Sequence, residues 1–164
     1  MNRFSARLIM LVVLLIGTTS MAVAGAEKSL KRSGWITHET DIPFEELYPR
    51  LKEAIKNTEL RQITTASASA GAKGRKVIIP GNRVVGVYNN FFAVRMLEAS
   101  IAAGIEAPLR FYLTEGPHGG SNLTYKIPTE VFRPYFDEGG KALKAMAREL
   151  DGLMDKIALE TIKG

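Results

Sequence analysis

Leu109-Arg110-Phe111-Tyr112-Leu113-Thr114-Glu115 and the later stretch Leu123-Thr124-Tyr125-Lys126-Ile127 decide the fold of this chain. Apolar and polar residues alternate in both stretches, and Pro117 to Ser121 between them form a turn signal. Because successive side chains of a strand point to opposite faces, the pattern predicts a β-hairpin with one apolar and one polar face. The apolar face must be covered by another element.

Segments with helical periodicity are predicted to cover the apolar face of the hairpin. From Lys141 onward, apolar residues recur in steps of three and four, which indicates a long amphipathic helix with its stripe at Leu143, Met146, Leu150, Leu153 and Ile157. A second apolar face runs from Phe44 to Ile55, where Pro49 predicts a kink or a restart. A third helix is predicted after Asn89 or Asn90, with a left-handed residue at Gly104 and an inner face of Phe92, Ala93, Met96, Leu97 and Ile101.

Further strands are predicted around these helices. They cover Trp35–Thr40, Leu60–Ala68 and the central Val84–Tyr88, and a further short apolar run lies at Val77–Ile79. Residues 69–76 are expected to form a surface loop. The predicted fold is therefore α+β, a two-layer sandwich whose mixed or mostly antiparallel sheet carries about three helices packed on one face. A single domain over residues 34–162 is expected.

The front of the chain has the order of a secretory signal. Arg3 and Arg7 precede the apolar run Leu8–Ile16, and the small residues of 22–26 follow. This predicts a cleavable signal peptide over 1–26, cut after residue 24 or 26, and then a flexible leader over 27–33. The apolar run is too short to span a bilayer. We therefore expect a periplasmic or secreted protein without a stable membrane anchor.

Composition narrows the function classes. The chain has 22 basic and 17 acidic residues, and loss of two signal-peptide arginines leaves 20 − 17 = +3. This mild excess has no basic block or arginine stripe, so nucleic acid is not a predicted partner. Cysteine is absent and histidine occurs twice. Disulfides and thiolate chemistry are therefore excluded, and neither a metal nor a cofactor is predicted, since the methionines fit a core better.

Three segments carry a family resemblance. They are Gly81-Asn82-Arg83-Val84-Val85-Gly86-Val87-Tyr88-Asn89-Asn90, then Ala107-Pro108-Leu109-Arg110-Phe111-Tyr112-Leu113, then Thr124-Tyr125-Lys126-Ile127-Pro128. Together they resemble the domain of unknown function 302 family, although Asn90 stands where that family has a proline. The resemblance implies an α+β domain that is often homodimeric, and it implies no catalytic mechanism.

Candidate site residues gather on the polar face of the hairpin. Arg110, Tyr112, Thr124 and Lys126 are expected to project from one face of the sheet. At the start of the third helix, Asn89 and Asn90 would offer backbone N–H groups to an anion, and Arg95 could reach the same area. One interpretation is a shallow cationic pocket for a small polar or anionic ligand. The other is a solvated sheet face with a helix cap, or the seam of a dimer.

These observations predict an exported, non-enzymatic binding or accessory module that forms homodimers. One alternative is a small envelope enzyme, a hydrolase or transferase, that uses Arg110, Tyr112 and Tyr125. Another is a structural partner of an envelope protein. The chain has no Ser-His-Asp, HExxH or nucleophile-elbow pattern.

Overall fold

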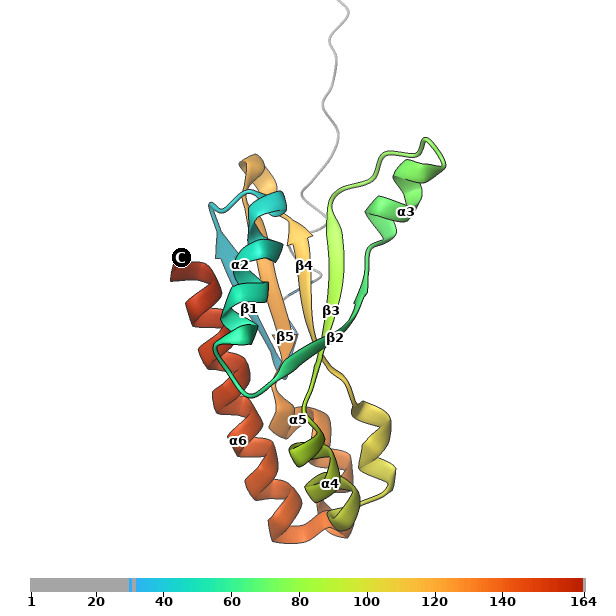
Figure 1. Cartoon of the computed structure of the whole chain (residues 1–164), viewed down its shortest axis with the longest axis vertical. Coiled ribbons are helices and arrows are strands. Elements are labelled where there is room, and N and C mark those ends of the chain that lie inside the picture. The colour runs from blue at the N-terminus through green and yellow to red at the C-terminus, as the bar shows by residue number, and fades with distance from the viewer. Residues whose placement is uncertain (1–29, 31, 164) are drawn as a thin grey trace, which may run out of the picture.

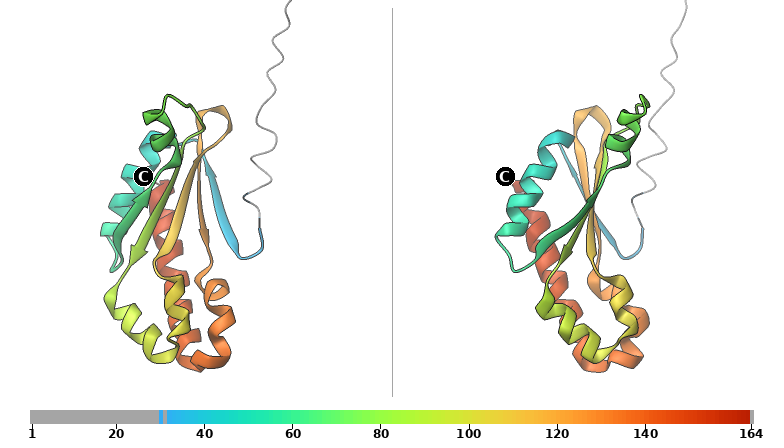
Figure 2. Two further views of the ribbon diagram at one scale, coloured as in Figure 1. Left: turned by 90° about the vertical axis from the view of Figure 1, so that its right-hand side faces the viewer. Right: turned by 45° about the vertical axis from the view of Figure 1, so that its right-hand side comes forward.

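A five-stranded antiparallel sheet forms the centre of the computed structural model, which describes residues 30 and 32–163. The predicted signal peptide 1–26 lies outside these residues, as does most of the predicted leader 27–33. The strand order is β1-β5-β4-β3-β2, with helices against one face (Figures 1 and 2). The strands are β1 Trp35–Thr40, β2 Arg61–Ala66, β3 Asn82–Tyr88, β4 Leu109–Glu115 and β5 Ser121–Lys126. The α+β prediction is confirmed.

The predicted hairpin is the middle of this sheet. Strands β4 and β5 pair with Phe111 opposite Tyr125 and Leu113 opposite Leu123, and the short turn η2, Pro117–Gly119, connects them. Both leucines are fully buried. The alternation predicted from the sequence therefore sets which face of the sheet meets the core.

Two helices cover that apolar face. Helix α2, Phe44–Lys56, packs on β4 and β5, and helix α6, Phe136–Lys163, packs on α2 and β1 (Figure 1). The predicted stripe of α6 is buried at Leu143, Met146, Leu150 and Ile157. Gly140 has a positive φ of 56°. The regular helix thus begins at Lys141, where the periodicity placed its start.

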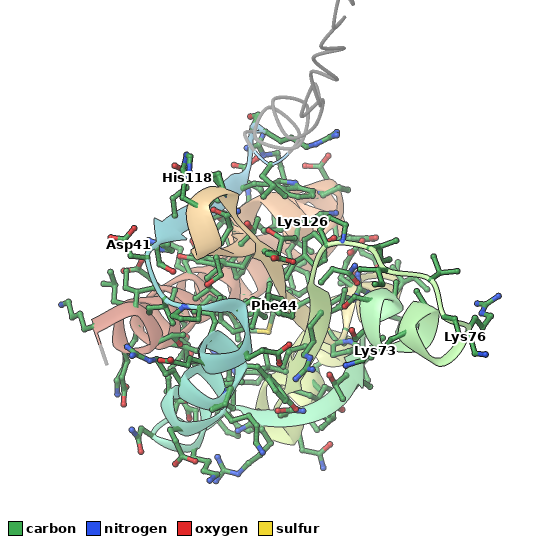
Figure 3. All side chains as sticks on the ribbon, turned by 90° about the horizontal axis from the view of Figure 1, so that it is seen from above. Asp41, Phe44, Lys73, Lys76, His118 and Lys126 are labelled. Carbon is green, nitrogen blue, oxygen red and sulfur yellow. The ribbon has the colours of Figure 1, made fainter. Side chains whose placement is uncertain are left out.

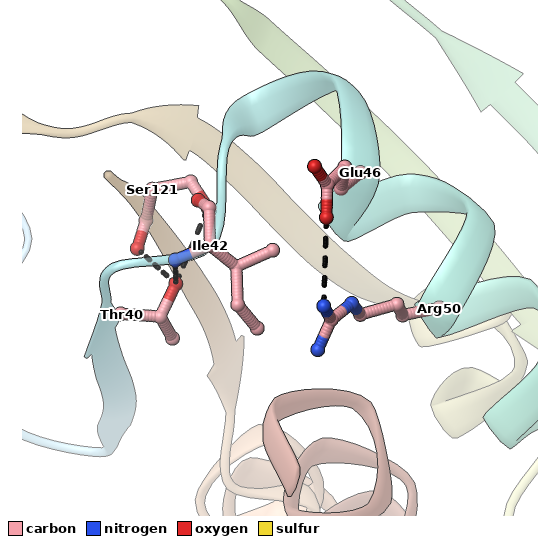
Figure 4. A network of polar contacts seen from close by, with 5 residues as sticks. All are labelled: Thr40, Ile42, Glu46, Arg50 and Ser121. Atoms are coloured by element: carbon pink, nitrogen blue, oxygen red, sulfur yellow. Dashed lines mark hydrogen bonds and ion pairs between the residues drawn. The ribbon is translucent and has the colours of Figure 1, made fainter. Parts of the chain in front are cut away.

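Helix α2 is tied to the sheet at its N-terminal end. The Thr40 hydroxyl donates to the Ser121 carbonyl at 2.9 Å, and the Ser121 hydroxyl donates to the Ile42 carbonyl (Figure 4). The helix runs through Pro49 as one element, so the predicted restart is absent. Proline lacks an N–H, which leaves the Glu45 carbonyl without its intrahelical donor but does not end the helix.

Smaller helices gather at the opposite end of the sheet. They are α4 Asn90–Ala99, the 3₁₀ helix η1 Ala102–Glu106, α5 Pro128–Phe132 and η3 Arg133–Tyr135. The prediction of a left-handed Gly104 is wrong, because α4 ends at Ala99 and Gly104 lies inside η1. Leu97 and Ile101 are also not core residues: Leu97 is about half exposed and Ile101 is 79 % exposed. Ile101 lies beyond the end of α4, whereas Leu97 lies within α4 but outside its buried face of Phe92, Ala93 and Met96.

One segment projects beyond the sheet. Helix α3, Ala68–Gly74, begins at Ser67, whose hydroxyl accepts from the Ala70 N–H at 3.1 Å. It lies apart from α2 when the molecule is seen from above (Figure 3). The prediction of a loop over 69–76 is therefore wrong, because the alanines around Gly71 sustain a capped helical turn. Residues 77–79 form no strand.

Within the described part of the chain, no helix has both the length and the apolar composition needed to cross a membrane.

Candidate functional site

The face of the sheet opposite α2 and α6 carries two rows of side chains that cross all five strands. Strand register places in the first row Trp35, Lys126, Arg110, Gly86 and Thr64, and in the second row Thr37, Thr124, Tyr112, Val84 and Ala66. The register of β4 and β5 pairs Phe111 with Tyr125, and one further step along both strands sets Arg110 opposite Lys126. Four predicted site residues, Arg110, Tyr112, Thr124 and Lys126, thus lie together.

These rows line a pocket of about 470 Å³. Small and apolar side chains form much of the lining, and polar groups are few among them. The residues that border it include Trp35, Ala66, Val84, Pro108, Tyr112 and Val131, with Glu106, Arg110 and Lys126 as the charged groups. This volume lies in the range of about 300–1,000 Å³ that is typical of small-molecule sites.

Two cations stand at this pocket without carboxylate partners. Arg110 is exposed and makes no hydrogen bond or ion pair with any other described residue. The Lys126 ammonium lies 5.7 Å from the centre of the Trp35 ring, a cation–π arrangement. The one nearby carboxylate, Glu106, accepts a hydrogen bond from the Tyr135 hydroxyl at 2.8 Å, which raises the pKa of Tyr135. The pocket therefore presents an excess of positive charge.

Gly86 lets the side chains of Thr64 and Pro108 pack closely over the sheet beside Arg110. A Cβ built on Gly86 would collide with the Thr64 Oγ1 and would lie 3.0 Å from the Pro108 ring. The glycine is therefore needed by its neighbours, because Thr64 and Pro108 occupy the space above its backbone.

Thr124 is polar yet only 1 % exposed. Its hydroxyl forms a hydrogen bond with the Thr37 hydroxyl across β1 and β5, at 3.1 Å. Such a pair satisfies two polar groups at once. Thr124 therefore supports the base of the pocket, and its hydroxyl is already engaged within the sheet.

Tyr125 belongs to the other face of the sheet. Its ring packs edge-on against Phe111 at 5.6 Å, and its hydroxyl lies 3.3 Å from the Asp155 carboxylate on α6. Burial, together with the nearby charges of Asp155 and Asp151, raises the pKa of Tyr125 well above its ordinary value. Tyr125 borders the same pocket as Arg110 and Tyr112, but its ring and hydroxyl point to the core side, because neighbours in a strand face opposite ways.

At the start of α4, the side chains of Asn89 and Asn90 are engaged in local hydrogen bonds. Asn89 caps the helix by accepting from the Phe91 N–H at 2.7 Å, and its amide donates to the Glu59 carbonyl. Asn90 accepts from the Tyr88 hydroxyl at 3.3 Å. The two asparagine side chains therefore form hydrogen bonds with backbone and side-chain groups around the first turn of α4.

Arg95 is also engaged elsewhere. Its guanidinium donates two hydrogen bonds of 2.7 Å to the Glu149 carboxylate on α6. This bidentate contact raises the pKa of Arg95 and lowers that of Glu149. Arg95 thus joins α4 to α6, and it is not available beside Asn89 and Asn90.

Sequence reasoning missed the apolar part of the pocket. Trp35, Val84 and Ala66 contribute side chains from three strands outside the hairpin. Alternation in Trp35-Ile36-Thr37-His38 could have placed Trp35 on the face of Thr37, but nothing local tells which strands are neighbours. Among the described residues, no cluster of three or more His, Cys, Asp or Glu side chains could hold a metal ion.

Comparisons with known proteins agree on the fold. The family described as "Domain of unknown function DUF302" matches residues 36–158. A crystal structure of an uncharacterized conserved DUF302 protein from Bacillus stearothermophilus is similar, with a TM-score of 0.69 and 16 % identity. The similarity covers 79 % of this chain and 99 % of that one. No curated protein sequence matches this chain.

Proposed function

This chain belongs to the DUF302 family, and from that premise we propose that it is a non-enzymatic binding or accessory module. The proposed site is the pocket on the open face of its sheet. The proposed ligand is a small molecule with an apolar body and an anionic group.

One observation carries this proposal: Arg110 and Lys126 stand opposite each other across β4 and β5 at the same pocket, with no acidic partner among the described residues. Two like charges side by side repel each other, so an anion between them relieves an unfavourable contact. A guanidinium also binds a carboxylate, sulfonate or phosphate in a bidentate manner.

The apolar lining of the pocket supports a ligand with an apolar body. Trp35, Val84 and Val131 border the same pocket as the two cations. An exposed sheet face that only met water would be expected to carry polar residues across all its strands. The combination of apolar lining and few charged groups is instead typical of ligand pockets.

The enzyme alternative has less support. It required Tyr125 beside Arg110 and Tyr112, and the Tyr125 hydroxyl is bonded to Asp155 on the core side. The hydroxyl of Thr124 is paired with Thr37, and the Glu106 carboxylate is bonded to Tyr135. A general base needs a free position near its substrate.

Two fluorescent probes test the ligand class. 8-Anilinonaphthalene-1-sulfonate combines an aromatic body with one negative charge, whereas N-phenyl-1-naphthylamine has a similar body without charge. For the double variant Arg110→Ala and Lys126→Ala, we expect the Kd of the sulfonate to rise about tenfold or more, because charge-assisted hydrogen bonds are lost. The neutral probe should change by less than about twofold.

The matched control removes two cations elsewhere. Lys141→Ala and Arg148→Ala lie on α6 and remove the same charge without touching the pocket. Sulfonate binding should then stay within about twofold of the parent chain. Equal loss in both double variants, or no loss in the first, would show that the pocket cations do not select the ligand.

Homodimer formation is a further part of the proposal, and a stripe on α4 and η1 supports it. Five apolar side chains there are about half or more exposed: Phe91, Val94, Leu97, Ile101 and Ile105. Leu97 packs toward Gly104, which joins the two helices into one surface. The stripe exposes on the order of 600 Å², close to the roughly 800 Å² that each partner contributes to a standard interface.

Sedimentation velocity tests the dimer. The parent chain should sediment as a dimer at micromolar concentration, and Ile101→Lys should make it monomeric because a buried unpaired charge opposes association. The control Ile63→Lys introduces the same charge at an exposed apolar residue outside the stripe. A parent chain that stays monomeric, or a dimer unaffected by Ile101→Lys, contradicts this interface.

Export to the periplasm or the medium completes the proposal, and it is supported by the order of charged, apolar and small residues in 1–26. Intact mass of the protein recovered from the cell envelope or medium should correspond to a chain that begins at residue 25 or 27. A full-length mass would contradict cleavage.

A further inference from the structure

The segment that projects from the sheet, residues 67–81, has an unusual charge pattern, and we call it the arm. It lies in a stretch, residues 60–97, that contains no Asp or Glu. Six basic residues occur in that stretch: Arg61, Lys73, Arg75, Lys76, Arg83 and Arg95. Three of them, Lys73, Arg75 and Lys76, belong to the arm.

The arm is held at its base and exposed at its tip. Asn82 accepts hydrogen bonds on its carbonyl from the Ser67 hydroxyl at 2.7 Å and on its side chain from the Ala68 N–H at 3.0 Å. No residue of α3 is buried. Figure 1 shows α3 standing away from the other helices, and Figure 3 shows Lys76 at the outer end of the arm. The arm is thus an ordered segment that projects from the sheet and is held at its base by hydrogen bonds to Asn82.

Apolar side chains follow the three cations at once. Val77 is about half exposed, Ile79 somewhat less, and Ile78 is 96 % exposed. Val77 is positioned by a hydrogen bond from its N–H to the Ala72 carbonyl at 3.0 Å. Three adjacent aliphatic side chains in water at the end of a projection are an unfavourable arrangement unless another surface covers them.

The cations of the arm have no acidic partners within the described residues. Lys73, Arg75 and Lys76 take part in no ion pair there. Two carboxylates, Glu45 and Glu115, border the cleft beneath the arm, but the Glu115 carboxylate accepts from the Gly81 N–H at 2.7 Å. The positive charge at the tip is therefore available to an external anionic surface.

We infer that the arm docks on an anionic lipid surface, with Lys73, Arg75 and Lys76 at the headgroups and Val77, Ile78 and Ile79 in the apolar layer beneath them. Basic residues beside exposed aliphatic ones are the combination that binds peripheral proteins to anionic bilayers. The inference is independent of the ligand pocket.

A protein partner fits this surface less well. The three aliphatic side chains expose roughly 350 Å², less than half of the roughly 800 Å² that one partner contributes to a standard protein interface. Such interfaces also favour aromatic anchors, and the arm contains none. Insertion into lipid needs only a short apolar tip with adjacent cations.

The stripe on α4 and η1 provides the internal contrast. It is larger and more apolar than the arm, but its charged residues are Glu98, Glu106 and an Arg95 already paired with Glu149. A surface with net negative charge is repelled by anionic lipid. Charge, and not apolar exposure alone, therefore distinguishes the two surfaces.

The absence of cysteine allows a direct test in the full chain. Ile78→Cys, labelled with an environment-sensitive fluorophore such as NBD, reports whether that position enters an apolar layer, whatever else holds the protein at the membrane. With vesicles of phosphatidylglycerol and phosphatidylcholine in equal parts, we expect a blue shift and an emission rise of about twofold or more. Vesicles of phosphatidylcholine alone should leave the emission nearly unchanged.

Ile63→Cys carries the same label at an exposed residue of β2 that belongs neither to the arm nor to the stripe, and its emission should not change with either vesicle. The variant Lys73→Gln, Arg75→Gln and Lys76→Gln should weaken the partitioning of position 78 on the order of 100-fold, from about fivefold for each cation. The matched variant Lys141→Gln, Lys144→Gln and Arg148→Gln removes the same charge from α6 and should leave it within about threefold.

Several results would overturn the inference. One is an unchanged Ile78→Cys emission with the mixed vesicles, and another is an equal change at Ile63→Cys. A shift caused by poly-glutamate instead of vesicles would indicate an acidic protein partner. A shift that grows with protein concentration in the absence of vesicles would indicate a second copy of the chain.

Discussion

Phe111 and Tyr112 are neighbours in β4, but they belong to two different environments. Phe111 is fully buried between the sheet and the helices, whereas Tyr112 is partly exposed at the pocket. The same division runs through the hairpin, with Leu113, Leu123 and Tyr125 on one side and Arg110 and Lys126 on the other. The core face supplies stability, and the open face carries the pocket for which we propose a ligand. A strand separates the two roles with a period of two residues.

The largest effect should come from breaking the core face. Phe111→Ala removes a fully buried ring and should lower the free energy of unfolding by about 3–5 kcal/mol. Tyr112→Ala, one residue along, should cost less, about 1–2 kcal/mol, because its side chain is only partly buried. Chemical denaturation of both variants measures the difference. Equal losses would show that the two faces are not energetically distinct.

Removal of the Tyr125 hydroxyl should lower the free energy of unfolding by less, and by an amount that depends on pH. Tyr125→Phe loses the bond to Asp155 and should cost about 1 kcal/mol near neutral pH. Because the native state raises the pKa of Tyr125 above its ordinary value of 10.0, its contribution is fully present below pH 10. It is lost as the pH rises above that value, since only the unfolded chain then ionises freely.

Denaturation of the parent chain and of Tyr125→Phe at a series of alkaline pH values checks this. The stability of the parent should fall more steeply above pH 10 than that of the variant. Parallel curves would mean that Tyr125 titrates alike in the folded and unfolded chains.

Thr124 tests an exception to the division. It lies on the open face but is buried by its pairing with Thr37. Thr124→Val should cost about 1 kcal/mol, since the Thr37 hydroxyl loses a partner. Thr124→Ser, which keeps the hydroxyl, should recover part of that loss. Thermal unfolding of both variants decides whether the hydrogen bond or the methyl group matters.

The smallest effect on stability is expected at Arg110. Arg110→Ala should change the free energy of unfolding by no more than about 0.5 kcal/mol, because the side chain is exposed and has no partner in the described chain. The same variant should weaken binding of the sulfonate probe severalfold. A large loss of stability would instead assign Arg110 to the support of the fold.

Much of the architecture followed from short-range patterns. The alternation of Leu109, Phe111 and Leu113 predicted β4, and the stripe from Leu143 to Ile157 predicted α6. The first turn of α4 was predicted from Asn89, whose side chain does cap the helix. These signals lie within one element. They are readable because strand and helix periods depend on residues a few positions apart.

The errors concern where elements end and where side chains meet in space. Ser67 was a usable signal for α3, yet the glycines that follow it favoured a loop. Ile101 was assigned to the core because the helical period was extended past Ala99, where α4 ends. Leu97 lies within α4 but outside its buried face of Phe92, Ala93 and Met96. The basic character of residues 69–76 is visible in the sequence, but only the fold shows that Lys73, Arg75 and Lys76 lie on one projecting segment.

The sequence alone determined the type and period of the main elements and the side of the hairpin that faces the core, because those properties are set by neighbouring residues. Only the tertiary structure decided which charges are paired. Arg95 forms an ion pair with Glu149, which is 54 residues away in the sequence. Arg110 and Lys126 border one pocket, and neither forms an ion pair with a described carboxylate. Strand pairing and helix packing bring distant residues together, and no local pattern encodes those distances.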